Sequence, residues 1–182
     1  TAVPGSRYTW NKMARPSLEG LRLALLDGQE VSVRRSDESS GFAPFNTPEH
    51  FIESIEIRDA RYMGRGKQPA KLPLNPYFNA LIGGRGTGKS TIVHALRLAY
   101  RREKELSANS EAGQTFNRFD KVAKTRTDEG GLRADTTITV QVQRDGTPYR
   151  LIWRQDGQGH AVEEFDTVTG GFKPSSGQAI TT

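Results

Sequence analysis

The sequence predicts a mixed α/β fold in which a strand, a glycine-rich loop and a helix are followed by an antiparallel meander. Three observations lead to this fold class. The apolar run 78–82 precedes a loop with four glycines, and apolar residues then recur at helical spacing from Lys89 to about Leu106. Residues 136–144 alternate in polarity, Asp145-Gly146 is typical of a hairpin turn, and 148–154 form the return strand.

The loop has the sequence Gly83-Gly84-Arg85-Gly86-Thr87-Gly88-Lys89-Ser90, which fills every fixed position of the pattern G-x-x-x-x-G-K-[ST]. Its glycines let the backbone curl into a nest of N–H donors, with no Cβ to hold a phosphate away. The helix that follows directs its positive dipole end at the same place. The pattern therefore predicts a site for a nucleoside triphosphate with Mg²⁺.

Each loop residue has an expected role in that site. Lys89 reaches the β- and γ-phosphates and is the catalytic residue, the Ser90 hydroxyl ligates the metal, and Thr91 reaches the α-phosphate. The expected nucleotide-binding set from the loop is Gly83, Gly84, Arg85, Gly86, Thr87, Gly88, Lys89, Ser90 and Thr91.

The composition limits the classes of protein to which the chain can belong. The chain has 182 residues, of which 34% are apolar, and a mean hydropathy of −0.65. It has no apolar run long enough to span a membrane, no start typical of a signal peptide, and no cysteine for disulfides or thiolate metal sites. We expect a cytoplasmic protein that does not bind membranes.

The N-terminal part predicts a short amphipathic helix and then a linker. Ser17 is a suitable N-cap and Gly28 a suitable stop for a helix between them. Residues 36–50 are polar and include Pro44 and Pro48. We therefore divide the chain into 1–35, the tail of an upstream domain, a linker at 36–50, and a second domain at 51–182.

The second domain opens with a predicted strand at 51–58 and a brief one at 72–74. Arg58 and Arg61 follow the first of these strands. Strand-end loops often carry function, so Arg61 or Arg58 is a candidate nucleotide contact, although an ordinary surface arginine is equally consistent with the sequence.

Two further stretches complete the predicted elements. Residues 107–134 have few apolar residues and no period, which predicts an exposed and partly mobile insertion. After the hairpin we expect a third strand at 161–166.

His94, on the helix after the loop, is expected to be a surface or packing residue rather than a base.

The basic residues are concentrated in the middle of the chain. Residues 51–133 carry 16 basic and 9 acidic side chains, whereas 1–50 carry 6 of each and 134–182 carry 4 and 6. Such an excess favours contact with nucleic acid, but a solvated helix face would have the same composition. Both interpretations remain open.

The segment from Asn79 to Ser90, with an Ile-x-Ile strand before it and a helix and meander after it, resembles the N-terminal half of an SMC/RecF-class ABC ATPase head. More narrowly it is similar to the TrlF-like proteins, in which a PHP phosphoesterase domain precedes such an ATPase. Thr9-Trp10 and Ser17 to Arg22 resemble the end of that PHP domain.

The resemblance implies ATP and Mg²⁺, a homodimer or larger homo-oligomer formed through the ATPase heads, and action on DNA or RNA, including antiphage defence. The chain has no recognisable Q-loop, signature motif or Walker B carboxylate; Ser175-Ser176-Gly177-Gln178 resembles S-G-G-Q only superficially. We therefore expect an incomplete P-loop domain that binds ATP without efficient turnover, and ATPase activity in the full-length protein. The alternative is a nucleic-acid-binding or regulatory module whose loop only senses nucleotide.

Overall fold

The structure is a computed structural model that describes residues 3, 5–28, 32–37, 47–66, 68–157 and 159–175. The chain divides into two units, Thr1–Thr47 and Pro48–Thr182. Each unit is described by itself.

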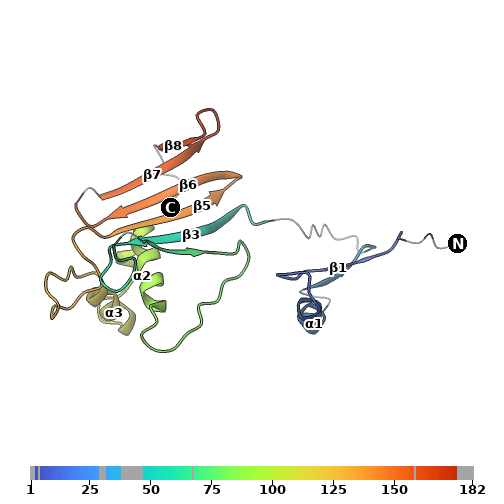
Figure 1. The fold of residues 1–182 in the computed structure, drawn as a ribbon, viewed down its shortest axis with the longest axis horizontal. Helices are drawn as coiled ribbons and strands as arrows, with labels where there is room; N and C mark the ends of the chain where they lie inside the picture. The colour runs from blue at the N-terminus through green and yellow to red at the C-terminus, as the bar shows by residue number, and fades with distance from the viewer. Residues whose placement is uncertain are drawn as a thin grey trace. The chain divides into compact units, whose positions relative to one another are not determined.

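In its described residues the first unit has one helix and a two-stranded sheet, which lie at the labels α1 and β1 in Figure 1. Strand β1 (Thr9–Asn11) pairs antiparallel with β2 (Val33–Arg35), and α1 (Leu18–Asp27) connects them. The predicted caps of α1 are confirmed: the Ser17 hydroxyl accepts from the Gly20 N–H, and Gly28 has a φ of 76°.

The second unit is built on a six-stranded antiparallel sheet in the order β4-β3-β5-β6-β7-β8. The strands are β3 (His50–Arg58), β4 (Ala70–Pro73), β5 (Thr137–Arg144), β6 (Thr147–Arg154), β7 (Gly159–Asp166) and β8 (Gly171–Pro174). The predicted meander is confirmed, and its first turn has Asp145 and Gly146 at φ 50° and 77°. Strand β8, which the sequence did not indicate, adds the last position.

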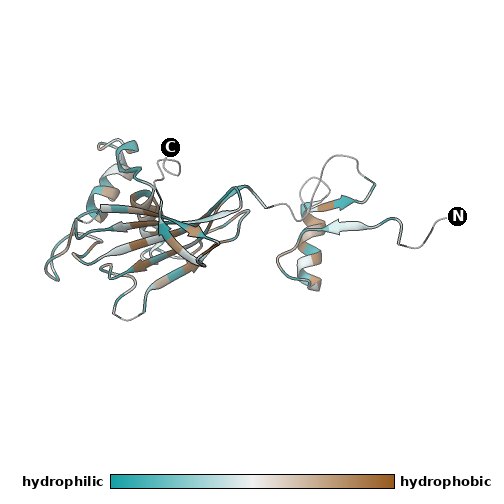
Figure 2. Cartoon of the chain, turned by 90° about the horizontal axis from the view of Figure 1, so that it is seen from above, coloured by the Kyte–Doolittle hydropathy of each residue, from teal (hydrophilic) through white to brown (hydrophobic). Residues whose placement is uncertain are grey.

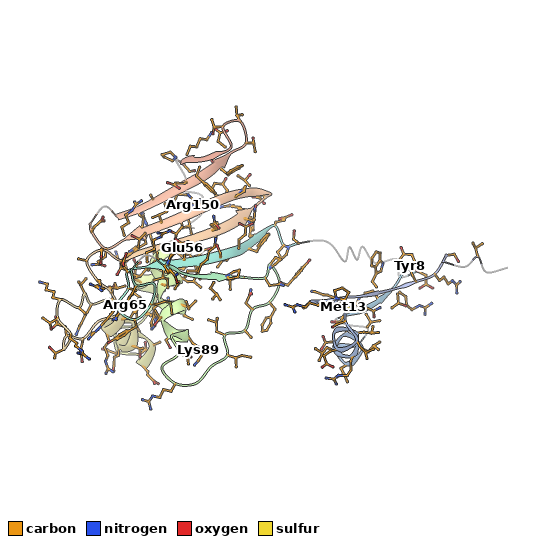
Figure 3. The ribbon with its side chains drawn as sticks, viewed as in Figure 1. Tyr8, Met13, Glu56, Arg65, Lys89 and Arg150 are labelled. Atoms are coloured by element: carbon orange, nitrogen blue, oxygen red, sulfur yellow. The ribbon has the colours of Figure 1, made fainter. Side chains whose placement is uncertain are left out.

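Hydrophobic and hydrophilic residues alternate along the strands (Figure 2), and the alternation of buried residues gives the sheet a core face and an open face. On the core face, Ile55, Ile138, Val140 and Leu151 are buried against helix α2 (Lys89–Ala99) and its neighbours. On the open face, Glu56 and Arg150 are polar (Figure 3). This period-2 pattern holds the register and fixes which side the helices cover.

Helix α2 is shorter than the sequence predicted. It ends at Ala99, and a 3₁₀ turn at Glu103–Glu105 follows in place of its predicted last turn. Arg101 takes a left-handed φ of 56°, which stops the helix. The fully buried apolar residues of the helix end with Leu98 and Ala99, and beyond them Tyr100 and Leu106 are only partly buried against the core.

The predicted strand at 78–82 is wrong for this structure. The segment has no strand assignment, and Phe78 and Ile82 are 83% and 93% exposed. Figure 1 shows it running from β4 to α2 along a path outside the sheet. An apolar run becomes a strand only where a neighbouring strand pairs with it, and the described residues provide none here.

The predicted mobile insertion at 107–134 is also wrong. It contains helix α3 (Glu111–Phe119), which is capped by the Ser110 hydroxyl accepting from the Gly113 N–H. Phe116 and Leu132 are buried in the core, at 4% and 0% exposure. A few widely spaced apolar residues thus pack residues 107–134 against the core, with α3 beside α2 (Figure 1).

Among the described residues, no helix is long and apolar enough to cross a membrane.

Candidate functional site

The glycine-rich loop leads directly into α2. Gly86 and Gly88 have φ of 83° and 87°, a region that favours glycine over other residues. Gly83 meets a different constraint, because a Cβ there would lie 2.7 Å from the Thr87 hydroxyl oxygen. Thr87 Oγ1 in turn donates to the Gly84 carbonyl at 3.0 Å. The shape of the loop therefore favours glycine at 86 and 88, a Cβ at 83 would require the Thr87 hydroxyl to shift, and a Cβ at 84 would meet open space.

Lys89, the first residue of α2, folds its side chain back over the loop. Its Nζ donates to the carbonyl oxygens of Gly83 and Gly84, each at 2.6 Å. This brings the cation of Lys89 together with Gly83 and Gly84, which are six and five residues earlier in the chain. An ammonium, a tight loop and a helix N-terminus at one place form an electropositive site suited to an anion.

A pocket of about 460 Å³ lies in front of the loop. It is lined by Tyr62, Met63 and every residue from Arg85 to Thr91. The structure thus brings most of the predicted nucleotide-binding set into one cavity, with Gly83 and Gly84 behind it as acceptors for Lys89. Among the described residues that line this pocket there is no carboxylate.

The hydroxyl of Ser90 is suited to a metal ion. The side chain is exposed and lines the pocket of the loop beside Lys89. Mg²⁺ prefers oxygen ligands and is usually held by one or two protein oxygens together with phosphate and water. Ser90 could supply one such ligand, and the phosphates of a nucleotide would supply others.

A second group of metal-ligating side chains lies elsewhere, at Glu49, His50 and Asp145. All three are exposed, and Asp145 also lies 3.6 Å from the guanidinium of Arg144. The positive charge of Arg144 beside Asp145 and the exposure of all three side chains make this cluster a poor site for a metal cation.

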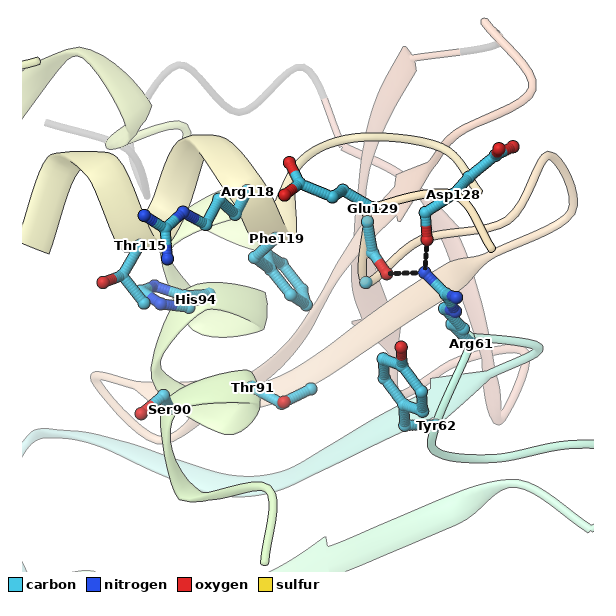
Figure 4. Close-up of a pocket in the computed structure, with 12 residues that line it drawn as sticks. Arg61, Tyr62, Ser90, Thr91, His94, Thr115, Arg118, Phe119, Asp128 and Glu129 are labelled. Atoms are coloured by element: carbon cyan, nitrogen blue, oxygen red, sulfur yellow. Dashed lines mark hydrogen bonds between the residues drawn. The ribbon is translucent and has the colours of Figure 1, made fainter. Parts of the chain in front are cut away.

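A second pocket of about 410 Å³ adjoins the first, and Figure 4 shows the side chains around it. The two pockets share Tyr62, Ser90 and Thr91. The other lining residues come from four places in the chain: Arg61, His94, Thr115, Arg118, Phe119 and 128–131. We call this cavity the α3 pocket. Sequence reasoning missed it because no single stretch of the chain contains its walls.

Arg61 holds one wall of the α3 pocket in place. Its guanidinium donates to the backbone carbonyls of Asp128 and Gly130 (Figure 4) and to that of Arg126. It also lies over the ring of Tyr62, 4.9 Å from the centroid. Arg61, the candidate nucleotide contact, thus lines the α3 pocket, and its donors are directed at the loop 126–130.

His94 forms the inner part of the same pocket. It is 8% exposed, and among the described residues neither ring nitrogen has a hydrogen-bond partner. Phe116 and Phe119 lie beside it, with ring centroids at 5.5 and 5.3 Å. Burial, and secondly the charge of Arg97, lower the pKa of His94 below its ordinary value, so the imidazole is neutral near pH 7.

The carboxylates around the α3 pocket have partners already. Asp128 accepts from the N–H groups of Lys124 and Thr125 and from the Thr125 hydroxyl, and these bonds lower its pKa. Glu129 lies 3.4 Å from the ammonium of Lys121. Both acids therefore stabilise the loop at 121–131 and neither is positioned as a base.

The basic excess of the central segment is partly neutralised. Arg97 and Arg102 lie 3.8 and 3.5 Å from Glu105, and Arg133 lies 4.0 Å from Asp135. Pairs of this kind contribute little to stability, and they weaken the local positive field of these arginines without changing the net charge of the segment.

Arg58, the other arginine considered at the strand end, binds Glu56 at 2.7 Å. Both residues lie on the open face of the sheet, which is the face away from α2.

No family model matches the chain, and no curated protein matches it.

Proposed function

We propose that the protein binds a nucleoside triphosphate with Mg²⁺ at residues 83–91 and belongs to an ATPase of the SMC/RecF-like class. The observation that carries this proposal is the position of Lys89. Its ammonium lies over a loop that needs glycine at 86 and 88, at the N-terminus of an 11-residue helix. An anion with several oxygens suits this arrangement better than any other ligand class.

Each group of residues in the site contacts a different part of the ligand. The N–H groups of the loop and of the first turn of α2 donate to phosphate oxygens, and Lys89 moves from the Gly83 and Gly84 carbonyls to the phosphates. Thr91 lines both pockets and is suited to the α-phosphate. Mg²⁺, when bound through Ser90, neutralises charge on the phosphates.

We further propose that residues 78–82 are the strand of a P-loop fold that lacks its neighbours among the described residues. Phe78, Leu81 and Ile82 are all exposed although they are apolar. Strands from another part of the protein would bury them and would place the loop at the end of a parallel sheet.

Turnover needs a group that orients the attacking water, and the described residues that line the loop pocket offer no carboxylate for it. We propose that the complete protein supplies this group through head-to-head dimerisation and acts on nucleic acid. Light scattering with and without MgATP tests the dimer: an unchanged mass in both conditions contradicts it.

The binding site itself is tested by Lys89→Ala. Removing the ammonium leaves the phosphates without their fixed cation, so we expect the affinity for MgATP to fall at least about 100-fold in isothermal titration calorimetry. Lys104→Ala is the matched control, since Lys104 is exposed and lies outside both pockets. Wild-type affinity in Lys89→Ala would refute the assignment.

A further inference from the structure

The α3 pocket adjoins the loop pocket. Ser90 and Thr91, the first turn of α2 after Lys89, line both cavities, and Tyr62 stands at their boundary. A ligand whose phosphates occupy the loop therefore has an adjoining space of about 410 Å³ for the group attached to its α-phosphate. This volume is in the usual range for small-molecule sites.

In the wall of the α3 pocket at residues 130–131, the backbone packs so closely against its neighbours that a side chain would not fit. A Cβ on Gly131 would lie 2.3 Å from Phe119 Cδ2, and one on Gly130 would lie 2.2 Å from the Lys121 carbonyl oxygen. Arg61 holds the same loop through its backbone carbonyls. These contacts tie the loop at 126–131 to Phe119, Lys121 and Arg61 on the side where it lines the pocket.

The inner wall combines aromatic surface with one polar group. Phe119 and the imidazole of His94, which both line the pocket, are tilted by 34° at a centroid distance of 5.3 Å, and Phe116, in the core and outside the lining, meets His94 edge to face. Flat aromatic surface of this kind suits a planar heterocyclic base.

His94 is the feature that points to a ligand. More than nine-tenths of it is buried, and neither ring nitrogen has a partner among the described residues. A neutral imidazole has one N–H donor and one acceptor, a combination that can pair with the edge of a base or with a ribose hydroxyl. Arg118, which lines the same pocket, is exposed and has no hydrogen-bond partner in the described part of the chain, so a ligand could displace its side chain.

We propose that the α3 pocket holds the nucleoside half of the bound nucleotide and that His94 hydrogen-bonds to it. The inference rests on the proposed function, because the phosphates must occupy the loop for the nucleoside to reach the pocket. His94 then makes the protein select a nucleotide over a bare polyphosphate.

The test compares MgATP with magnesium tripolyphosphate, which has the phosphates and no nucleoside, in isothermal titration calorimetry. The wild-type protein should bind MgATP at least about tenfold more tightly than tripolyphosphate, the equivalent of one or two hydrogen bonds and a stacked ring. Equal affinity for the two ligands would mean that the nucleoside lies in solvent, and would overturn the proposal. This comparison needs no variant.

His94→Phe keeps the ring and removes both nitrogens. It should weaken MgATP about tenfold and leave tripolyphosphate unchanged, whereas His94→Gln, which keeps a donor and an acceptor, should retain most of the preference. His50→Phe, at an exposed histidine outside both pockets, should change neither.

The outcomes separate the two proposals. If the wild-type protein binds neither ligand, the nucleotide site itself is refuted. If Lys89→Ala loses both ligands while His94→Phe binds MgATP as tightly as wild type, only the role of His94 is refuted.

Discussion

At the level of single residues, His94 is a histidine whose burial sets its charge. Its pKa lies below the ordinary value, chiefly through burial and secondly through Arg97. An unfolded histidine titrates near pH 6.5. Below about that pH the imidazole is protonated in the unfolded chain to a greater extent than in the folded chain. This group therefore lowers the folding stability progressively as the pH falls through about 6.5.

We predict that His94→Phe removes this pH dependence. Between about pH 8 and pH 5.5 the wild-type protein should lose more of its unfolding free energy than the variant does, because its folded state disfavours the protonated imidazole. Urea denaturation at several pH values measures the difference, with His50→Phe as the exposed control. Parallel pH profiles for wild type and His94→Phe would show that His94 is protonated without cost in the folded protein.

Arg61 stabilises the protein through three carbonyls at once. Replacement by alanine leaves those of Arg126, Asp128 and Gly130 without their charged donor. We expect Arg61→Ala to cost about 2 kcal/mol of unfolding free energy, measured by chemical denaturation. Arg61→Lys should restore little, because an ammonium cannot span the same three acceptors as a guanidinium.

The control for Arg61 is Arg126→Ala, which keeps the backbone carbonyl that Arg61 binds and removes an exposed side chain. A change within about 0.5 kcal/mol is expected there. An equally small effect of Arg61→Ala would mean that water replaces its contacts fully.

At the level of elements, the accuracy of the sequence prediction depended on how local each signal is. The caps of α1 at Ser17 and Gly28 and the turn at Asp145-Gly146 act within a few residues, and the structure confirms them. Helix α3 was missed because its core contacts, such as Phe116, are sparse and most of its other residues are polar. Its burial depends on a partner helix that the local sequence does not reveal.

For residues 78–82 the error is the opposite one: a local signal predicts an element that the structure does not contain. Its apolar run predicts a strand equally well whether or not a neighbouring strand exists, and pairing partners are never local. In the proposed ATPase, these residues are buried between strands, although Ile82 is 93% exposed in the structure.

We therefore predict that Ile82→Ala destabilises the complete protein by roughly 2 kcal/mol or more, as expected for a buried isoleucine. Val168→Ala is the matched control, because Val168 is 92% exposed on the turn between β7 and β8 and should cost less than about 0.5 kcal/mol. Thermal or chemical denaturation compares them. Equal, small costs would mean that residues 78–82 are not a strand in the complete protein.

At the level of the whole molecule, the two halves of the candidate site differ in how they could be found. The phosphate loop is a continuous pattern, so its residues could be listed from the sequence. The α3 pocket combines residues near positions 61, 94, 118 and 130, and only the fold brings them together. What the sequence cannot supply is the distance between segments far apart in the chain.

The most direct test of the account is a crystal structure of the protein with Mg²⁺ and a non-hydrolysable ATP analogue. We predict that the β-phosphate lies in the loop at 83–90, that Lys89 Nζ contacts the phosphates instead of the Gly83 and Gly84 carbonyls, and that Ser90 ligates the metal. An analogue bound elsewhere, with Lys89 still on those carbonyls, would contradict the central claim.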